Sequence, residues 1–145
     1  MTQVKRLKYT LGFVYCRETN QILLLNRTKS PWMGKWNGVG GKLDVGESPY
    51  ECITREAQEE TGLYLTNWQG KGAFTWEVYT TQKGNNSSES VKETGGLYLF
   101  IAEVTKQEVD EYKTPITYCK EGILDWKSLD WILHEENLGI GSFPV

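Results

Sequence analysis

The sequence predicts a single domain of mixed α and β structure, in the α/β or α+β class, over residues 1–145. Two apolar segments, Tyr9–Cys16 and Gln21–Asn26, flank a polar turn, which is the pattern of a β-hairpin. A helix with start and stop signals is predicted at Pro49–Thr61, and a buried strand at Gly96–Val104. Strands interspersed with helices pack as a sheet covered by helices, which gives the fold class.

Weaker patterns account for the rest of the chain. Aromatic and β-branched residues predict a strand at Gly72–Thr81, and a last strand is expected at Glu121–Trp126. Lys106–Tyr112 and Leu129–Glu136 are expected to form short helices. The polar segment Lys83–Ser90 (KGNNSSES) is expected to be a mobile loop between strands, because it contains Gly, Asn and Ser and no apolar residue.

Composition limits the classes of protein to which the chain can belong. Of 145 residues, 39% are hydrophobic and 24% are charged, which is typical of a globular domain with its own core. No apolar run reaches the roughly 18 residues of a membrane span, and the first residues lack the pattern of a signal peptide. We therefore expect a cytoplasmic protein with no membrane association. Cys16, Cys52 and Cys119 are expected to be free thiols.

Charge and histidine content exclude two further kinds of site. The net charge is −3, so the chain lacks the excess of basic residues with which proteins bind long nucleic acid. The single histidine, His134, excludes a histidine-rich metal centre. A small phosphorylated ligand remains compatible with this charge, because a bound metal ion can reverse the local field.

The helix predicted at Pro49–Thr61 has clear signals at both ends. Ser48 is a suitable N-cap and forms a Ser-x-x-Glu capping box with Glu51. Proline is favoured at the first helical position, and Gly62 suits the position after the last helical residue. The limits of this helix are therefore the best defined of any predicted element.

One face of this helix concentrates negative charge. Glu56, Glu59 and Glu60 occupy positions i, i+3 and i+4, so they project within an arc of about 100°. Like charges at this spacing repel each other, which indicates that a cation lies against them. Hard divalent cations such as Mg²⁺ prefer carboxylate oxygens. The preceding segment Trp36–Lys42 (WNGVGGK) contains glycines whose backbone amides can approach a phosphate closely.

The spacing of these residues resembles the Nudix box. Gly41 is followed after five residues by Glu47, and after seven more by the segment Arg55–Leu63 (REAQEETGL). This arrangement matches GX5EX7REUXEEXGU at each fixed position. The resemblance implies an α/β/α sandwich with a mixed β-sheet between helices. It also implies a hydrolase that cleaves a nucleoside diphosphate linked to another moiety, with Mg²⁺ or Mn²⁺ as the cofactor.

The resemblance also implies roles for the matching residues. The three glutamates of the helix face would bind the metal or orient the attacking water, and the backbone carbonyl of Gly41 would join the metal shell. Glu47 and Arg55 match an ion pair that ties the loop to the helix. Many Nudix nucleotidases carry one more glutamate on a later strand, and Glu121 is the main candidate here, against an exposed charge at a strand end. Weaker candidates for that position are Glu89, Glu93 and Glu103.

The segment Trp36–Lys42 further resembles the MutT-like enzymes that hydrolyse oxidised purine nucleoside triphosphates. The resemblance implies that Asn37 hydrogen-bonds the base and that Lys42 contacts the substrate. The alternative for Asn37 is an asparagine that only forms part of a turn. The C-terminal region His134–Phe143 lacks the tryptophan and the aspartate pair that the mammalian enzymes use to hold the base. Aromatic residues that could stack on a base instead, or belong to the core, are Phe74, Trp76 and Trp131.

Three functions remain open on these grounds. The first is a metal-dependent pyrophosphohydrolase of purine nucleoside triphosphates such as 8-oxo-dGTP. The second retains the chemistry on ADP-ribose, a dinucleoside polyphosphate or a pterin triphosphate. The third is a non-catalytic nucleotide sensor, which the intact glutamates disfavour. In each case the expected ligand is a small nucleotide, and the expected assembly is a monomer or a homodimer.

Overall fold

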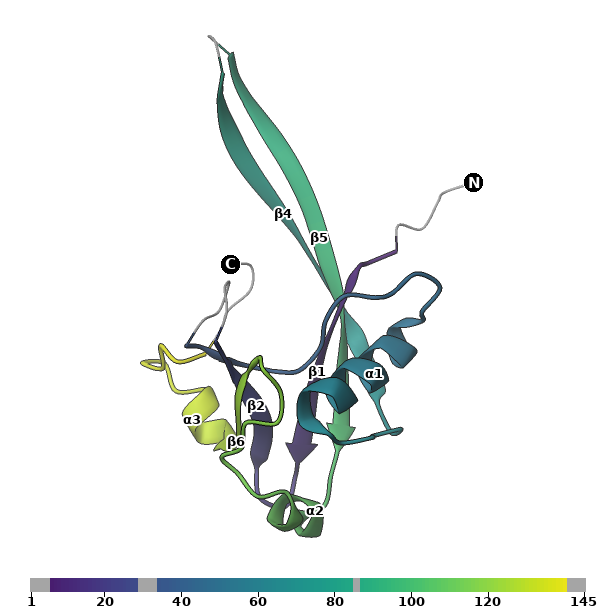
Figure 1. Ribbon diagram of the computed structural model, residues 1–145. Coiled ribbons are helices and arrows are strands. Elements are labelled where there is room, and N and C mark those ends of the chain that lie inside the picture. The colour runs from purple at the N-terminus through teal and green to yellow at the C-terminus, as the bar shows by residue number, and fades with distance from the viewer. Residues whose placement is uncertain (1–5, 29–33, 85–86, 141–145) are drawn as a thin grey trace.

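The computed structural model describes residues 6–28, 34–84 and 87–140, and describes only the backbone for residues 80–93. Figure 1 shows a twisted sheet with one long helix across a face and a two-stranded arm that extends away from it. In chain order the elements are β1 (Tyr9–Cys16), β2 (Gln21–Arg27), β3 (Trp36–Asn37), α1 (Pro49–Thr61), β4 (Gln69–Gly84), β5 (Ser87–Glu103), α2 (Lys106–Glu111), β6 (Gly122–Ser128) and α3 (Leu129–Ile132).

The sheet is mixed, as the sequence predicts for this fold class. Its strand order is β3-β2-β1-β5-β4, and β6 also pairs with β2. β1 and β5 are parallel, from the pair Tyr9 and Leu97 to the pair Tyr15 and Glu103, whereas the other pairs are antiparallel. β1 lies at the centre of the sheet and α1 packs against it, so the sheet supports α1 from one side.

The hairpin of β1 and β2 forms where the sequence predicts it. Its turn contains Asn20 at a φ of 55°, a left-handed conformation that asparagine tolerates better than most residues. Gly12 in β1 allows α1 to approach, since a Cβ atom there would lie 2.6 Å from the side chain of Ile53. The buried core extends from this contact through both strands and the helix. Its members are Val14, Cys16, Leu23, Leu25, Val39, Ile53, Ala57, Trp68, Phe100, Ala102, Val104, Val109 and Leu124.

Both ends of α1 have the predicted caps. The Ser48 hydroxyl accepts a hydrogen bond from the Glu51 backbone, and the Glu51 carboxylate accepts one from the Ser48 backbone. At the other end Gly62 adopts a φ of 78° and donates its N–H to the carbonyl of Gln58. The helix limits predicted from sequence, Pro49 and Thr61, are confirmed.

The predicted loop at Lys83–Ser90 is wrong. β4 continues to Gly84 and β5 begins at Ser87, so the two strands pair from the base of the arm to its tip. Antiparallel pairing uses backbone N–H and C=O groups, which polar residues supply as well as apolar ones. The centre of the predicted loop, at positions 85 and 86, lies outside the described residues.

The remaining elements differ from the predictions mainly in length. The two-residue strand β3 has no sequence prediction, and β6 runs from Gly122 to Ser128 rather than from Glu121. The last helix ends at Ile132, four residues before the predicted end, because the backbone carbonyl of Trp131 accepts a hydrogen bond from the Asn137 side chain. No helix in the described part of the chain has the length and hydropathy to cross a membrane.

Candidate active site

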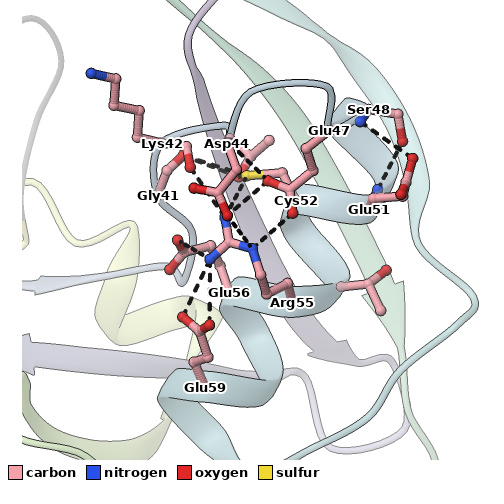
Figure 2. Close-up of polar contacts among 12 residues, drawn as sticks. Gly41, Lys42, Asp44, Glu47, Ser48, Glu51, Cys52, Arg55, Glu56 and Glu59 are labelled. Atoms are coloured by element: carbon pink, nitrogen blue, oxygen red, sulfur yellow. Dashed lines mark hydrogen bonds and ion pairs between the residues drawn. The ribbon is translucent and has the colours of Figure 1, made fainter.

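The centre of the candidate site is Arg55, in the second turn of α1 (Figure 2). Its guanidinium donates two hydrogen bonds to the Glu47 carboxylate, from Nε at 2.7 Å and from Nη2 at 2.9 Å. Bidentate pairs of this kind are the strongest arginine–carboxylate contacts. The hydrogen bond from Arg55 holds the pKa of Glu47 at about 2, well below its usual range. The predicted pair between loop and helix is therefore in contact.

Arg55 also joins the glycine-rich segment to the glutamate face. Its Nη2 donates to the backbone carbonyl of Lys42 at 3.2 Å. Its Nη1 contacts Glu56 at 2.9 Å and Glu59 at 3.3 Å. Arg55 thus contacts both the glycine-rich loop and two of the three predicted metal ligands, Glu56 and Glu59. The Lys42 side chain is exposed and points away from this network in Figure 2, so here its backbone, and not its amine, is the group in contact.

Glu60 is the most deeply buried carboxylate of the site. It is 4% exposed, and its Oε2 accepts a hydrogen bond from the N–H of Gly40 at 2.9 Å. Burial raises the pKa of Glu60 to about 9, and the neighbouring Glu121 carboxylate acts in the same direction. A carboxylate in this environment needs a proton or a cation to be stable at neutral pH.

Glu121 reaches Glu60 from a distant part of the chain. It directly precedes β6, and its backbone carbonyl accepts a hydrogen bond from the N–H of Thr28 at 2.8 Å. Its Oε2 is buried and has no hydrogen-bond partner among the described residues. Buried polar atoms without a partner are rare in native proteins, and many of them mark a binding site.

Glu56 completes a group that we call the carboxylate cluster, formed by Glu56, Glu60 and Glu121. Its side chain is 16% exposed, and burial raises its pKa although Arg55 acts in the opposite direction. The charge of Glu121 also raises the pKa of Glu56. Glu59 differs from the cluster, since its side chain is 59% exposed and lies at the rim on Arg55.

The glycines before the helix are needed for close approach. A Cβ atom on Gly41 would lie 2.6 Å from the Glu56 carboxylate, so only glycine lets the loop lie against the cluster. Gly40 has a φ of 147°, and a Cβ atom there would collide with the backbone carbonyl of Thr10. The Gly41 carbonyl accepts the N–H of Thr10 at 2.8 Å, the Thr10 hydroxyl at 3.4 Å and the Cys52 thiol at 3.8 Å, so it is already engaged by β1 and α1.

Asn37 lies at the end of β3, next to this loop. It is 7% exposed, and its Oδ1 accepts a hydrogen bond from the N–H of Gly38 at 2.8 Å. Its Nδ2 is buried without a hydrogen-bond partner among the described residues. The side chain therefore has an unused donor and an acceptor that is already engaged.

One basic residue of the same region was missed in the sequence. The Nε of Arg27 is buried and lacks a hydrogen-bond partner within the described residues. Arg27 ends β2 directly opposite Gly122, next to Glu121. The available signal was an arginine that closes an apolar strand, QILLLNR, shortly before the glycine-rich segment. A strand-end arginine is common on protein surfaces, so this signal is weak without the structure.

The other candidate residues lie apart from the cluster. Glu103 pairs with Arg17 at the end of β5, and the side chains of Glu89 and Glu93 lie outside the described residues. The alternative that Phe74 and Trp131 belong to the core is wrong, since they are 57% and 37% exposed. Trp76, which is partly buried, covers Gly95 in the arm.

The donor set fits a hard divalent cation. Glu56, Glu60 and Glu121 offer only carboxylate oxygens, the ligands that Mg²⁺ and Mn²⁺ prefer. Across the described ranges, no group of three or more His, Cys, Asp or Glu side chains could hold a metal ion as arranged here. In this arrangement Arg55 pairs with Glu56, one of the three carboxylates.

Comparison with known proteins identifies the family. The NUDIX domain family model matches residues 6–141. The uncharacterized Nudix hydrolase YvcI of Bacillus subtilis is 30% identical over 77% of this chain and 60% of its own length. The 8-oxo-dGTP diphosphatase of Proteus vulgaris is 37% identical over 46% of this chain and 59% of its own length. The chain thus spans about three fifths of each of these two relatives.

A solved structure supports the same assignment. The MutT protein of Bacillus halodurans is 28% identical to this chain, with a TM-score of 0.61, over 86% of this chain and 69% of that protein. The family model, the box residues and the mixed sheet with its helices agree with one another. The chain therefore belongs to the Nudix family.

Proposed function

We propose that this chain is a divalent-metal-dependent hydrolase of nucleoside triphosphates, which it converts to a nucleoside monophosphate and pyrophosphate, with a preference for purines such as 8-oxo-dGTP. The observation that carries the proposal is the carboxylate cluster of Glu56, Glu60 and Glu121. Two of its members have raised pKa values, and the third has a buried oxygen without a partner among the described residues. Such a cluster next to a glycine-rich loop suits a cation bound together with phosphate.

In this proposal the carboxylate cluster binds the metal, and the exposed Glu59 orients the attacking water. When bound, Mg²⁺ would supply charge neutralisation for the phosphate oxygens. A residue that accepts a proton from water must be ionised at the working pH. Glu59 lies at the solvent-exposed rim on Arg55, whereas Glu60 is buried among the residues assigned to the metal. We therefore assign metal binding to Glu56, Glu60 and Glu121, and water orientation to Glu59.

The phosphate chain would lie between the loop and Arg27. The water oxygen attacks phosphorus, the bond from that phosphorus to the bridging oxygen breaks, and the water proton passes to a carboxylate. The Arg27 guanidinium has a buried N–H without an acceptor among the described residues, and a phosphate oxygen is a strong acceptor for it. The close approach of the loop at Gly41 to Glu56 would place phosphate and metal side by side.

Asn37 supports the purine preference. Its Oδ1 is engaged by the N–H of Gly38, so only the Nδ2 donor is available to a ligand. The guanine edge, oxidised or not, offers the acceptor O6, which such a donor can contact. The name of the Proteus vulgaris relative, an 8-oxo-dGTP diphosphatase, supports the same substrate class.

The proposal is tested by Mg²⁺-dependent pyrophosphate release from a panel of nucleotides, with the second product identified. The panel contains dGTP, 8-oxo-dGTP, the other nucleoside triphosphates and ADP-ribose. Glu60→Gln should lower kcat by about 100-fold or more, since it removes a ligand charge at nearly constant volume. The matched control is Glu103→Gln, a carboxylate paired with Arg17 outside the site, which should retain wild-type turnover.

Each result of this panel has a distinct meaning. Monophosphate and pyrophosphate from purine triphosphates would support the proposal. Activity on ADP-ribose alone would leave the metal site in place and refute the substrate. Nucleotide binding that is independent of metal, without any turnover, would identify a sensor instead of an enzyme.

The base contact is tested by Asn37→Asp, which retains the shape of the side chain and removes the free donor. We expect kcat/KM for purine triphosphates to fall about tenfold and pyrimidine rates to change less, because a buried donor lost from recognition costs the hydrogen bond it makes. Steady-state kinetics on dGTP and dCTP measure this difference. An equal loss on both substrates would show that Asn37 supports the loop and does not read the base.

A further inference from the structure

Residues 113–121 connect α2 to β6 and deliver Glu121 to the carboxylate cluster. The segment folds back on β6, where Ile116 and Leu124 exchange backbone hydrogen bonds of 3.0 and 2.8 Å. Its last residue is tied to the end of β2 through the N–H of Thr28, which donates to the Glu121 carbonyl. These contacts fix the backbone on the sheet side of the segment.

The opposite side of the segment contacts the C-terminal end of α1. Three atoms of the Tyr118 side chain lie 2.6–3.0 Å from the position that a Cβ atom on Gly62 would occupy. Gly62 is in the left-handed region, with a φ of 78°, and has no side chain to hold the ring away. At the residue before Gly62, the carbonyl of Thr61 accepts a hydrogen bond from the Tyr112 hydroxyl at 2.7 Å. The ring of Tyr118 therefore packs directly on the C-cap of α1.

In this contact, Gly62 lies two residues after Glu60 in the chain, and Tyr118 lies three residues before Glu121. The two chain segments thus meet at two adjacent points, Tyr118 on Gly62 and Glu121 beside Glu60. At the second contact the two carboxyl groups lie together in a poorly solvated site. Thr28 fixes the backbone of Glu121 on the side of β2, and the contact of Tyr118 with Gly62 fixes the same segment against α1.

We propose that Tyr118, seated on Gly62, is a positioning residue that holds Glu121 against Glu60 and so completes the carboxylate cluster. The inference rests on the proposed function, because it gives Tyr118 a role through Glu121. The contact with Gly62 is made by the aromatic ring, so the ring is the part of the side chain that matters. The requirement for glycine at position 62 then has two causes, the helix C-cap and the ring above it.

The test is a double-mutant cycle with Tyr118→Ala and Glu121→Gln. Two quantities are measured for each variant, kcat for nucleotide hydrolysis and the dissociation constant of Mn²⁺ by electron paramagnetic resonance without nucleotide. Tyr118→Ala should lower kcat by about tenfold, since small misplacements of site groups have effects of this order or more. In the Glu121→Gln background it should change neither quantity, because residues that act through one another are not additive. Tyr118→Phe retains the ring and should restore both quantities to wild-type values.

A glycine pair provides a matched control for the helix side. Gly62→Ala places a methyl group where the ring lies, whereas Gly46→Ala, at a φ of 80°, places one in open space. Both substitutions introduce the same left-handed strain. Gly62→Ala should therefore weaken Mn²⁺ binding several-fold more than Gly46→Ala does, with intact folding of both variants checked by circular dichroism.

The outcomes separate this inference from the proposed function. If Glu121→Gln lowers kcat but Tyr118→Ala does not, the role of Tyr118 is refuted and the proposed site remains. The role of Tyr118 is also refuted if Tyr118→Phe is as impaired as Tyr118→Ala, or if the Tyr118 effect persists in the Glu121→Gln background. If Glu121→Gln changes neither quantity, the assignment of Glu121 fails and the inference fails with it.

Discussion

The two halves of strand β5 are held in different ways. Residues 97–103 pair with β1 on one side, and residues 97–101 also pair with β4 on the other. Side chains of this half enter the core below α1. Residues 87–96 pair with β4 alone, and form with residues 75–84 the arm that extends from the sheet (Figure 1). One strand therefore belongs to a packed sheet at one end and to a two-stranded ribbon at the other.

The two halves are ordered by different interactions, burial in the core in one half and backbone pairing in the other. In the inner half, Phe100 and Ala102 are buried, so the register is fixed by which face enters the core. In the arm, order comes from backbone pairing, and an isolated two-stranded hairpin is only marginally stable in water. The candidate site lies on the inner side of this boundary. We expect substitutions in the two regions to differ accordingly.

Among the charged residues of the inner region, the largest effect on stability is expected from Arg55→Met. It removes the cation that serves Glu47, Glu56 and Glu59, and leaves Glu47, whose side chain is 12% exposed, without its partner. Loss of one partner from a buried pair costs about 3–5 kcal/mol, and we expect about 2 kcal/mol here because Arg55 is partly exposed. Denaturation in urea, with chelator present, measures this change.

The control for this variant is Arg17→Met, which breaks the exposed pair with Glu103 at 75% and 50% side-chain exposure. Exposed pairs contribute about 0–1 kcal/mol, so this variant should lose much less stability. Equal losses in the two variants would show that the Arg55 network is an ordinary surface ion pair and not a centre that organises the site.

A smaller effect is expected in the pH dependence of stability of the metal-free protein. The pKa of Glu47 is lowered from 4.5 to about 2, so its contribution is present above pH 4.5 and is lost as the pH falls towards 2. The pKa of Glu60 is raised from 4.5 to about 9, so the folded state holds its proton more tightly, and stability declines as the pH rises from 4.5 to 9.

Thermal unfolding across this pH range, with a chelator, measures both limbs. Glu60→Gln should flatten the decline between pH 4.5 and 9 and leave the acid limb intact. Arg55→Met should flatten the acid limb, because Glu47 then loses the partner that lowers its pKa. An alkaline limb of unchanged slope in Glu60→Gln would show that Glu60 is not protonated in the folded protein.

The same contrast explains what the sequence could predict. The α1 helix was predicted to the residue, because Ser48, Glu51 and Gly62 act on their own backbone neighbours and leave a local pattern. The meeting of Glu60 with Glu121 could be suggested only through the family resemblance, since 61 positions of chain separate them and no local rule relates them. Arg27 and Tyr118 were missed for the same reason, because their significance lies in partners distant in sequence.

The arm was mispredicted for a related physical reason. A polar run such as Lys83–Ser90 is usually a loop, because it has no apolar face to bury. Here the strands that precede and follow it are already aligned by the sheet, from the pair Gln69 and Ile101 outward. Once the first pairs form, each further pair adds backbone hydrogen bonds without a new loop to close, so side-chain polarity does not stop the ladder.

The smallest effect is expected from removal of most of the arm. Replacing residues 78–93 with Asn-Gly would join Glu77 to Thr94, which are already cross-strand partners, through a favoured hairpin turn. Trp76 would continue to cover Gly95 at the base. Because the described residues of this stretch pair only with each other in the sheet ladder, the melting temperature should change by less than about 3 °C. Turnover should remain within about twofold of the full chain, since the cluster lies on other elements.

The matched control lies in the other half of the same strand. Ala102→Ser adds one hydroxyl to a fully buried position and should cost about 1–3 kcal/mol, because the new polar group has no partner there. One buried oxygen atom would then have a larger effect than the loss of the outer arm. A larger loss of stability on removal of the arm than in Ala102→Ser would show that the arm stabilises the fold. A change in oligomeric state on removal of the arm, measured by light scattering, would show that its strand edges contact another copy of the chain.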